Sequence, residues 1–419
     1  MRITTAVQIG LFLCASSSSG CDDGLLPVPD LSYGLDSHWP KASTYSGVGG
    51  GRVLVTSSID DTISLFDLTK VGQPDFSELV RLPVGSTPVE LEGPHHAAID
   101  PSGEYYYVNI SNFVPGAGGG PHGPRGTGLA KGYILKYRSS DNELVGSQEV
   151  DRNPGDVAVS DDGKTLYVSH YDQQKIIDVA LVGGPQSDMD TRFLIVNAET
   201  LTVKAALTLC PGAHGVKLSP DGTRAYVSCI SDEIAVVDLA NPDHPVTRIP
   251  MAPDAGPAIA PKYEPYALTL SPSGDIWVSC RSRDEMRVIN GQTLTLDTAR
   301  IVGVNGAPMF GAFTADGASL YVPTQVNDAI AVIDAATGAL RQEIPVRSDM
   351  CINVHQLRFT PDGRWGLLVC EGDHGGPGSL VVLDMASGGS FVQSVPVGRF
   401  PDFVAVIEDA GSRKRRANP

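Results

Sequence analysis

The sequence predicts an all-β protein, a seven-bladed β-propeller of four-stranded blades in which strands from the two ends of the chain share one blade. Three observations lead to this prediction. A strand–turn–strand motif occurs six times, three strands near the N-terminus lack an inner partner, and an inner strand without a blade lies near the C-terminus. With 46 Gly and 31 Pro among 419 residues, the chain is also rich in the residues that tight turns between short strands require.

The first residues have the features of an export signal. Arg2 precedes an apolar stretch, Val7–Ala15, and the sequence Ser-Ser-Gly-Cys follows, ending at Cys21. This ending resembles the lipobox of bacterial lipoproteins, with Ser18 in the position where Leu is usual. We therefore expect Cys21 to be lipidated; an ordinary signal peptide cleaved near Gly20 is the alternative.

These features divide the chain into four parts. We expect a signal peptide at 1–20, a lipid-anchored tether at 21–51, the propeller at 52–409 and a basic flexible tail at 410–419. No later segment approaches the roughly 20 apolar residues of a membrane-spanning helix, so the lipid would be the only membrane attachment. We expect an exported monomer in the periplasm or the outer cell envelope. The net charge of −17 argues against nucleic acid as a partner, because phosphates require a basic surface.

The repeated motif consists of a β-branched strand, a turn of the form Ser-Pro-Asp-Gly, and a second strand rich in Tyr and Val. The six turns begin at Pro101, Asp161, Pro220, Pro272, Ala315 and Pro361. Subtraction gives intervals of 60, 59, 52, 43 and 46 residues between neighbouring turns. Because a blade takes roughly 40–50 residues, the longer intervals predict insertions. A third strand follows most hairpins, as in EIAVVDL, AIAVIDA and SLVVLDM, and a fourth lies before the next repeat.

The seventh blade is predicted to form from both ends of the chain. The N-terminal end has three strands, RVLVTSS, TISLFDL and ELVRLPV, without an inner one. The inner strand that is needed, DFVAVIED, lies at Asp402–Asp409. Joining them closes the ring and removes the open strand edges that an incomplete ring would expose.

The second strands carry a resemblance to a known family. The copies LYVSH, AYVSC and LYVP resemble the YVTN family of bacterial seven-bladed propellers, which is related in form to lactonase-like and cytochrome d1-like propellers. The resemblance covers nearly all of Arg52–Asp409. It implies the fold and leaves the activity open, because one propeller framework hosts many unrelated functions.

The repeat also predicts a ring of residues at the mouth of the central channel. The residue six positions before each turn is expected to precede the inner strand and to face the channel mouth. These residues are His95, Gly155, His214, Tyr266, Met309 and His355, with Asp402 as the equivalent in the split blade. Strand alternation directs His96 away from the channel, into the packing between blades. Imidazoles and a thioether suit copper, and imidazoles also suit zinc or a haem iron.

His95, His214 and His355 are therefore candidate metal ligands, for copper before haem or zinc. The chain has no CxxCH motif, which excludes covalently attached c-type haem. A channel lined by hydrated histidines without an ion is the alternative.

Two pairs of cysteines frame two of these histidines with the same C-x3-H-x14-C spacing: Cys210 and Cys229, and Cys351 and Cys370. In an oxidising compartment this spacing predicts two disulfides, each within one blade. Metal ligation by the thiolates is the alternative. Cys280 is left over and is expected to be a small buried hydrophobe.

Further polar residues are expected on the same face. The Gly-rich segment Pro115–Gly128 carries His122 and Arg125, the segment Glu371–Ser379 carries Asp373 and His374, and His170 ends a second strand. These segments are interpreted either as flexible surface loops or as flaps that add polar groups to the channel mouth.

Three functions remain open. The one we favour is a non-enzymatic binding or scaffold module that recognises an envelope protein or a polymer through its loop-bearing face. The second is a metal- or haem-binding, redox-related propeller. The third is a lactonase-like hydrolase, because GPHHAAIDPSGEYYYVNIS resembles a lactonase stretch in which an Arg stands where this chain has His95. A lactonase would use His96 or His355 as base with Arg125 as the oxyanion-stabilising cation.

Overall fold

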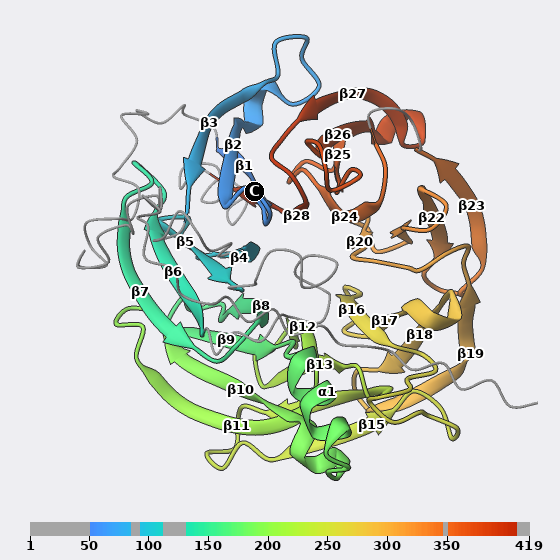
Figure 1. Ribbon diagram of the computed structural model, residues 1–419. Coiled ribbons are helices and arrows are strands. Elements are labelled where there is room, and N and C mark those ends of the chain that lie inside the picture. The colour runs from blue at the N-terminus through green and yellow to red at the C-terminus, as the bar shows by residue number, and fades with distance from the viewer. Residues whose placement is uncertain (1–50, 85–92, 112–130, 347–350, 409–419) are drawn as a thin grey trace, which may run out of the picture. The chain divides into compact units, whose positions relative to one another are not determined.

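The computed structural model describes residues 51–84, 93–111, 131–346 and 351–408, which form seven four-stranded antiparallel sheets. The sheets are the blades of a propeller, and Figure 1 shows them around a central axis with one strand of each innermost. Each inner strand contacts the inner strands of both neighbouring blades, so the ring is closed. The predicted fold class is confirmed.

The blades are numbered here in chain order and given from the inner to the outer strand. Blade 1 is β28 (Pro401–Ile407), β1 (Arg52–Ser57), β2 (Thr62–Asp67) and β3 (Glu78–Pro83), and blade 2 is β4 (Pro94–Ile99), β5 (Tyr105–Ile110), β6 (Gly132–Arg138) and β7 (Leu144–Val150). Blade 3 is β8 (Pro154–Val159), β9 (Thr165–His170), β10 (Asp190–Asn197) and β11 (Val203–Pro211), and blade 4 is β12 (Ala213–Leu218), β13 (Arg224–Cys229), β14 (Glu233–Asp238) and β15 (Val246–Pro250).

The remaining three blades follow the same order. Blade 5 is β16 (Pro265–Leu270), β17 (Ile276–Cys280), β18 (Glu285–Asn290) and β19 (Thr295–Gly303). Blade 6 is β20 (Ala312–Phe313), β21 (Ser319–Thr324), β22 (Ala329–Asp334) and β23 (Leu340–Pro345). Blade 7 is β24 (Val354–Phe359), β25 (Trp365–Cys370), β26 (Ser379–Asp384) and β27 (Ser390–Pro396).

Blade 1 confirms the predicted closure. The C-terminal β28 pairs antiparallel with β1, with Leu54 opposite Ala405, and β1 pairs on its other side with β2. In Figure 1 the red β28 and the blue β1 lie next to each other.

The core lies between the blades, because strand residues alternate between the two faces of each sheet. In β13, Ala225 and Val227 pack in the cluster shared with blade 3, whereas Tyr226 between them packs in the cluster shared with blade 5. Such clusters join every pair of neighbouring blades around the ring. The Tyr-Val alternation of the second strands therefore fills two interfaces at once.

The long interval between the second and third repeats contains a helical insertion. Between β9 and β10 lie α1 (Gln173–Leu181) and a short 3-10 helix, Gln186–Met189. The Asp172 side chain caps α1 by accepting a hydrogen bond from the Lys175 amide at 3.0 Å. No helix in the described ranges is long and apolar enough to cross a membrane.

Three further 3-residue helical turns lie among the described residues. They are Leu68–Lys70, Arg281–Arg283 and Met385–Ser387, and each lies directly after a strand. They occupy single turns and do not alter the blade pattern.

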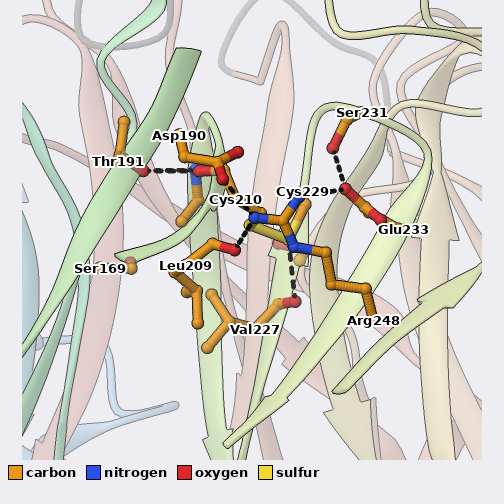
Figure 2. The surroundings of a disulfide bond; sticks show 12 residues. Ser169, Asp190, Thr191, Leu209, Cys210, Val227, Cys229, Ser231, Glu233 and Arg248 are labelled. Atoms are coloured by element: carbon orange, nitrogen blue, oxygen red, sulfur yellow. Dashed lines mark hydrogen bonds and ion pairs between the residues drawn. A yellow bond between two sulfur atoms is a disulfide. The ribbon is translucent and has the colours of Figure 1, made fainter. Parts of the chain in front are cut away.

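Both predicted disulfides are present, Cys210–Cys229 and Cys351–Cys370. Their assignment to single blades is wrong for the first one. Cys210 lies at the end of β11 in blade 3 and Cys229 lies at the end of β13 in blade 4, so this bond joins two blades. Figure 2 shows Arg248 beside it, bound to Asp190, to the Leu209 carbonyl oxygen and, at 3.4 Å, to Glu233. Among the described cysteines Cys280 alone is free, and it is buried as predicted.

Candidate functional site

The inner strands are irregular at the positions predicted to face the channel. In β4, β8, β12 and β16 the ladder shifts register between the first and second residue pairs, for example between Pro94 and Ala97 and between Ala213 and Val216. In β24 a similar shift lies between Val354 and Gln356. A bulge breaks the strict alternation of side chains. Two consecutive residues of one inner strand can therefore both face the channel.

His96 is the clearest result of this irregularity. Its ring lies 5.4 Å from the ring of His214, 5.0 Å from Phe310 and 4.7 Å from Phe403, measured between centroids. These three residues belong to blade 4, to the start of blade 6 and to blade 1. His96 therefore points toward the axis, and its predicted place in the packing between blades is wrong because the bulge suspends the alternation.

Three histidines form one cluster at this place. His95, His96 and His214 are all 0% exposed, and each can present a ring nitrogen so that the three atoms lie within 4.8 Å of one another. The centroid of the His95 ring is 4.3 Å from that of His96 and 5.3 Å from that of His214. We call these three residues the histidine cluster.

Asp156 orients one member of the histidine cluster. Its carboxylate lies 2.8 Å from Nδ1 of His96 and also accepts a hydrogen bond from the Val216 amide at 2.8 Å. With Nδ1 engaged in this way, Nε2 of His96 is directed toward the channel, and it has no hydrogen-bond partner among the described residues. A carboxylate bound to one ring nitrogen is the arrangement that orients histidine ligands in metal sites.

Backbone carbonyl groups hold two other ring residues. Nδ1 of His95 lies 3.4 Å from the Pro154 carbonyl oxygen, and Nδ1 of His355 faces the Asp402 carbonyl oxygen. In both residues Nδ1 therefore serves as the structural nitrogen, which leaves Nε2 as the atom suited to ligation.

His355 belongs to a second group of possible ligands, separate from the histidine cluster. His355, Glu371 and Asp402 each offer one ligand atom within 4.8 Å of the other two, and the three residues are at most 3% exposed. We call them the carboxylate group. The Phe310 ring lies 5.0 Å from His96 and 5.6 Å from His355, between centroids, so it contacts one member of each set. The sequence placed His95, His214 and His355 on one ring, and the structure divides them between two ligand sets.

Aromatic rings surround the histidine cluster. Tyr266 stacks on His214 at 4.1 Å, Tyr171 meets the same imidazole edge-on at 4.7 Å, and the Arg281 guanidinium lies 4.5 Å above the Tyr266 ring. Tyr266, Phe310 and Met309 pack in one buried cluster with Ile176 of α1. The insertion after β9 thus contacts the residues that line the site.

Burial sets the ionisation of these groups. Desolvation, aided by the neighbouring His95 and His96, holds the pKa of His214 well below its usual value, and desolvation lowers the pKa of His355 to about 3. Desolvation opposes ionisation of Asp156, but His96 and Lys217 outweigh it and keep the pKa of this carboxyl well below its usual range. His214 and His355 are therefore neutral at neutral pH, the form in which imidazole binds metals.

In blades 3, 4 and 5, a serine of the second strand donates a hydrogen bond to the backbone carbonyl group of the ring residue in the next blade. The Ser228 hydroxyl donates to the Tyr266 carbonyl oxygen at 2.6 Å and accepts from the Gly215 amide at 2.9 Å. Ser169 likewise donates to the His214 carbonyl oxygen, and Ser279 donates to that of Met309 at 2.8 Å. Ser169 and Ser228 are the Ser of Tyr-Val-Ser and Ser279 is the Ser of Trp-Val-Ser at the same repeat position, and each one bonds its blade to the next blade at the ring residue.

The ring lacks a side chain at Gly155 for a steric reason. A Cβ atom there would lie 2.8 Å from the Ala213 carbonyl oxygen and 3.1 Å from the His214 Cα. The β8 and β12 backbones thus approach each other too closely for any larger residue.

The other predicted site residues lie elsewhere. His170 is buried, with Nδ1 at 2.7 Å from the Arg192 carbonyl oxygen, and it belongs to neither ligand set. Asp373 is exposed and accepts hydrogen bonds from the amides of Gly375 and Gly376 in its loop, while His374 in the same loop binds Glu371 at 2.9 Å. His122, Arg125 and Cys21 lie outside the described residues, as do the signal peptide, the tether up to residue 50 and the whole basic tail.

Four important residues were not identified from the sequence: Asp156, Phe310, Glu371 and Tyr171. Asp156 and Phe310 both stand one position after the ring residue of their blade, the same register as His96. Reading this second register along the six repeats would have found them. Glu371 lies at the first position of the Glu371–Ser379 loop, one residue after a disulfide cysteine, and no pattern in the sequence marks it.

These features define a class: a seven-bladed propeller with a buried, histidine-rich centre on its axis. No family model and no curated protein sequence matches the chain. Solved structures do share the fold. A candidate 6-phosphogluconolactonase from Bacteroides uniformis has a TM-score of 0.60 at 16% identity, over 85% of this chain and 99% of that one.

Two further solved structures extend the likeness. The dihydro-heme d1 dehydrogenase NirN has a TM-score of 0.55 at 17% identity, over 88% of this chain and 78% of its own. Hydrazine synthase from Kuenenia stuttgartiensis has a TM-score of 0.57 at 18% identity, over 77% of this chain and 97% of that one. The chain therefore has the fold of the lactonase-like and cytochrome d1-like propellers, as its Tyr-Val strands indicated, and at these identities the likeness extends to the fold alone.

Proposed function

We propose that the protein binds one transition-metal ion, copper in the first place, through the histidine cluster His95, His96 and His214. The observation that carries this proposal is the convergence of three fully buried ring nitrogens within 4.8 Å of one another. Three imidazoles form a ligand set that suits copper and zinc. The carboxylate of Asp156 at Nδ1 of His96 supplies the outer contact that such ligands usually have.

Metal binding would also remove a free-energy cost that an empty channel leaves in place. A buried ring nitrogen without a partner costs about 1–3 kcal/mol. Nε2 of His96 is such an atom among the described residues, and a metal–nitrogen bond would remove that cost. The cluster is also closed, since its three members are 0% exposed. A closed site favours retention of the ion, or electron transfer, over turnover of a large substrate.

A haem fits the cluster less well than a single ion does. The imidazoles of His95, His96 and His214 pack against one another with centroids 4.3–5.4 Å apart, and Phe310 and Tyr266 fill the next layer. A porphyrin is wider than these spacings. The donor set thus supports copper or zinc before haem.

The lactonase-like alternative receives little support. His96 and His355, the two proposed bases, are both 0% exposed. The ring of His96 is enclosed by His214, Phe310 and Phe403, so a cyclic ester would need a rearranged site to reach it. Its partner in that proposal, Arg125, lies outside the described residues.

A binding role at the cell envelope is a second candidate, and a specific surface favours it. Beside α1 lies an apolar groove of about 430 Å³, lined by residues that include Ile177, Leu181 and Ile259. Leu181 is 79% exposed and Ile259 is 59% exposed, which is unusual for large apolar side chains in one patch. Export to the envelope, with lipidation at Cys21, remains part of this proposal. The two disulfides support it, because such bonds persist in oxidising compartments.

Metal analysis tests the principal proposal. Protein exported to an oxidising compartment and purified without chelator or metal-affinity resin should contain about one equivalent of copper or zinc bound by the histidine cluster. The Cu(II) form should show coupling to imidazole nitrogens in its electron paramagnetic resonance spectrum. His96→Gln and His214→Gln should lose that spectrum. His170→Gln is the matched control, because His170 is equally buried and lies outside both ligand sets.

Two outcomes would overturn the proposal. One is wild-type protein with only a small fraction of an equivalent of copper, zinc and iron together. The other is a His96→Gln protein that keeps the same nitrogen-coupled Cu(II) spectrum as His170→Gln.

A further inference from the structure

The carboxylate group, His355 with Glu371 and Asp402, differs in chemistry from the histidine cluster. It offers two carboxylates and one imidazole, where the cluster offers three imidazoles. Carboxylate oxygens suit harder ions such as Mn²⁺, and the addition of an imidazole extends the choice to Fe²⁺ and Zn²⁺. We propose that this group is a second, separate metal site, for a divalent cation such as Mn²⁺, Fe²⁺ or Zn²⁺.

Charge is the first argument for a cation. Asp402 is 0% exposed and Glu371 is 3% exposed, so two carboxyl groups are taken out of water within 4.8 Å of each other. Two ionised carboxylates so close repel each other strongly in a buried place, and a divalent cation between them balances their charge. The nearby cationic side chain of Arg281 also acts on Glu371, but it is engaged with the Tyr266 ring and, at 3.8 Å, with Glu264.

Orientation is the second argument. Nδ1 of His355 is held by the Asp402 backbone carbonyl, and its Nε2 lies 3.9 Å from a Glu371 carboxylate oxygen. That separation is too long for a hydrogen bond, and one ligand atom of each of the three residues lies within 4.8 Å of the other two. A metal at about 2.0–2.2 Å from each donor would bridge such a gap.

The surroundings of Glu371 provide the third argument. Gln325 donates to one carboxylate oxygen at 2.8 Å, and His374 lies 2.9 Å from the other. His374 in turn packs on the Phe400 ring at 4.1 Å. A ligating carboxylate in a metal site is usually held by such outer hydrogen bonds, and each oxygen keeps a second lone pair for the metal.

This second site does not depend on the first one. The two sets share no residue, and their donors differ in hardness. The channel would then hold two ions of different kinds, copper at the histidine cluster and a harder cation at the carboxylate group.

Binding of Mn²⁺ tests the proposal directly, because free Mn²⁺ has an electron paramagnetic resonance signal that weakens on binding. Metal-stripped protein is titrated with Mn²⁺ alone, both in the folded state and during refolding from guanidinium, since the ligands are buried. Wild-type protein should bind about one equivalent. Glu371→Gln should bind it at least about 100-fold more weakly, because loss of a ligand costs more than the 10–100-fold typical of an outer contact.

Control variants distinguish loss of the carboxylate group from loss of the histidine cluster and from general destabilisation of the protein. Asp373→Asn makes the same acid-to-amide change two residues away, at a carboxylate that only caps its own loop, and should bind Mn²⁺ like wild type. His96→Gln should also keep Mn²⁺ while losing copper. His355→Gln is a second ligand variant, and each variant is compared only if its guanidinium midpoint without metal lies near that of wild type.

Wild-type protein that takes up neither Mn²⁺ nor Zn²⁺ with the histidine cluster already loaded would overturn this second site, whatever the copper result. Mn²⁺ binding that is equal in Glu371→Gln and Asp373→Asn would do the same. Loss of copper from His96→Gln with no Mn²⁺ bound anywhere would leave the first proposal standing and reject this one.

Discussion

The Cys210–Cys229 disulfide should contribute strongly to stability because it joins two blades. It links the end of β11 in blade 3 to the end of β13 in blade 4, across a sequence separation of 19. In the chain-entropy treatment, a cross-link that closes a loop of this length stabilises the folded state by about 3 kcal/mol at 25 °C. That corresponds to roughly a 100-fold change in the unfolding equilibrium constant.

The test replaces both partners by alanine, Cys210→Ala with Cys229→Ala, and measures guanidinium unfolding under oxidising conditions. Cys280→Ala is the matched control: it removes one sulfur from an equally buried, unbridged position, at a cost of about 1 kcal/mol. The cost of the double variant beyond twice that of the control measures the cross-link. The second disulfide, Cys351–Cys370, has the same separation of 19, so its removal should cost the same additional amount.

Both disulfides join cysteines with the same sequence separation of 19, so they are expected to contribute equally to the free energy of unfolding, and unequal contributions would refute this expectation. If the double variant loses no more than twice the cost of Cys280→Ala, the bond does not act by restricting the unfolded chain. If one bond contributes fully and the other contributes nothing, loop length is not what determines the effect. Hydrogen exchange at the amides beside His214 should increase in the first double variant, because the staple next to this ring residue is gone.

Three other changes probe burial, blade clamping and strand spacing. Burial lowers the pKa of His170 to about 4, so between pH 6.5 and 4 the unfolded chain takes up a proton before the folded chain does, and the free energy of unfolding falls by up to about 3 kcal/mol. His170→Gln should flatten that part of a curve of stability against pH, and an unchanged slope would contradict the prediction. The buried Asp232 carboxylate, 0% exposed, accepts hydrogen bonds from four backbone amides of residues 256–264. Asp232→Asn should therefore lower the free energy of unfolding by about 3 kcal/mol. Guanidinium unfolding compares it with the exposed control Asp243→Asn, and equal midpoints would refute the prediction. Gly155→Ala would place a Cβ atom 2.8 Å from the Ala213 carbonyl oxygen, so it should both destabilise the protein by about 1–3 kcal/mol and weaken copper binding. A stable variant with unchanged copper affinity would contradict the prediction that β8 and β12 lie too close for a side chain at this position.

The repeat was sufficient to predict the architecture because a propeller blade is a local structure. Turn residues such as those at Pro220 and Pro361 act within a hairpin, and the alternation in each second strand acts over two neighbouring blades. Even the sharing of blade 1 followed from counting strands at the two ends. Local chemistry decides these features, so a single sequence contains enough information to predict them.

The site depends on a feature that the repeat does not encode. Counting positions placed His95, His214 and His355 on one ring, which assumes that every inner strand alternates regularly. The register shifts next to these residues break that assumption, turn His96 inward and bring Asp156 to it. A bulge has no dependable sequence signal, so the direction of His96 could not be derived from spacing.

The location of the two disulfides fits the division of the channel into two ligand sets. Cys210 and Cys229 lie on either side of His214, and Cys351 and Cys370 lie on either side of His355, with Glu371 directly after Cys370. Each ligand set thus has one disulfide close in the sequence to one of its histidines. Ligands that are fixed before the ion arrives bind it more tightly, because less conformational freedom is lost on binding. A bond that served general stability alone would have no reason to lie beside a buried histidine in both cases, and for this reason we expect loss of either disulfide to weaken metal binding at its own site more than at the other.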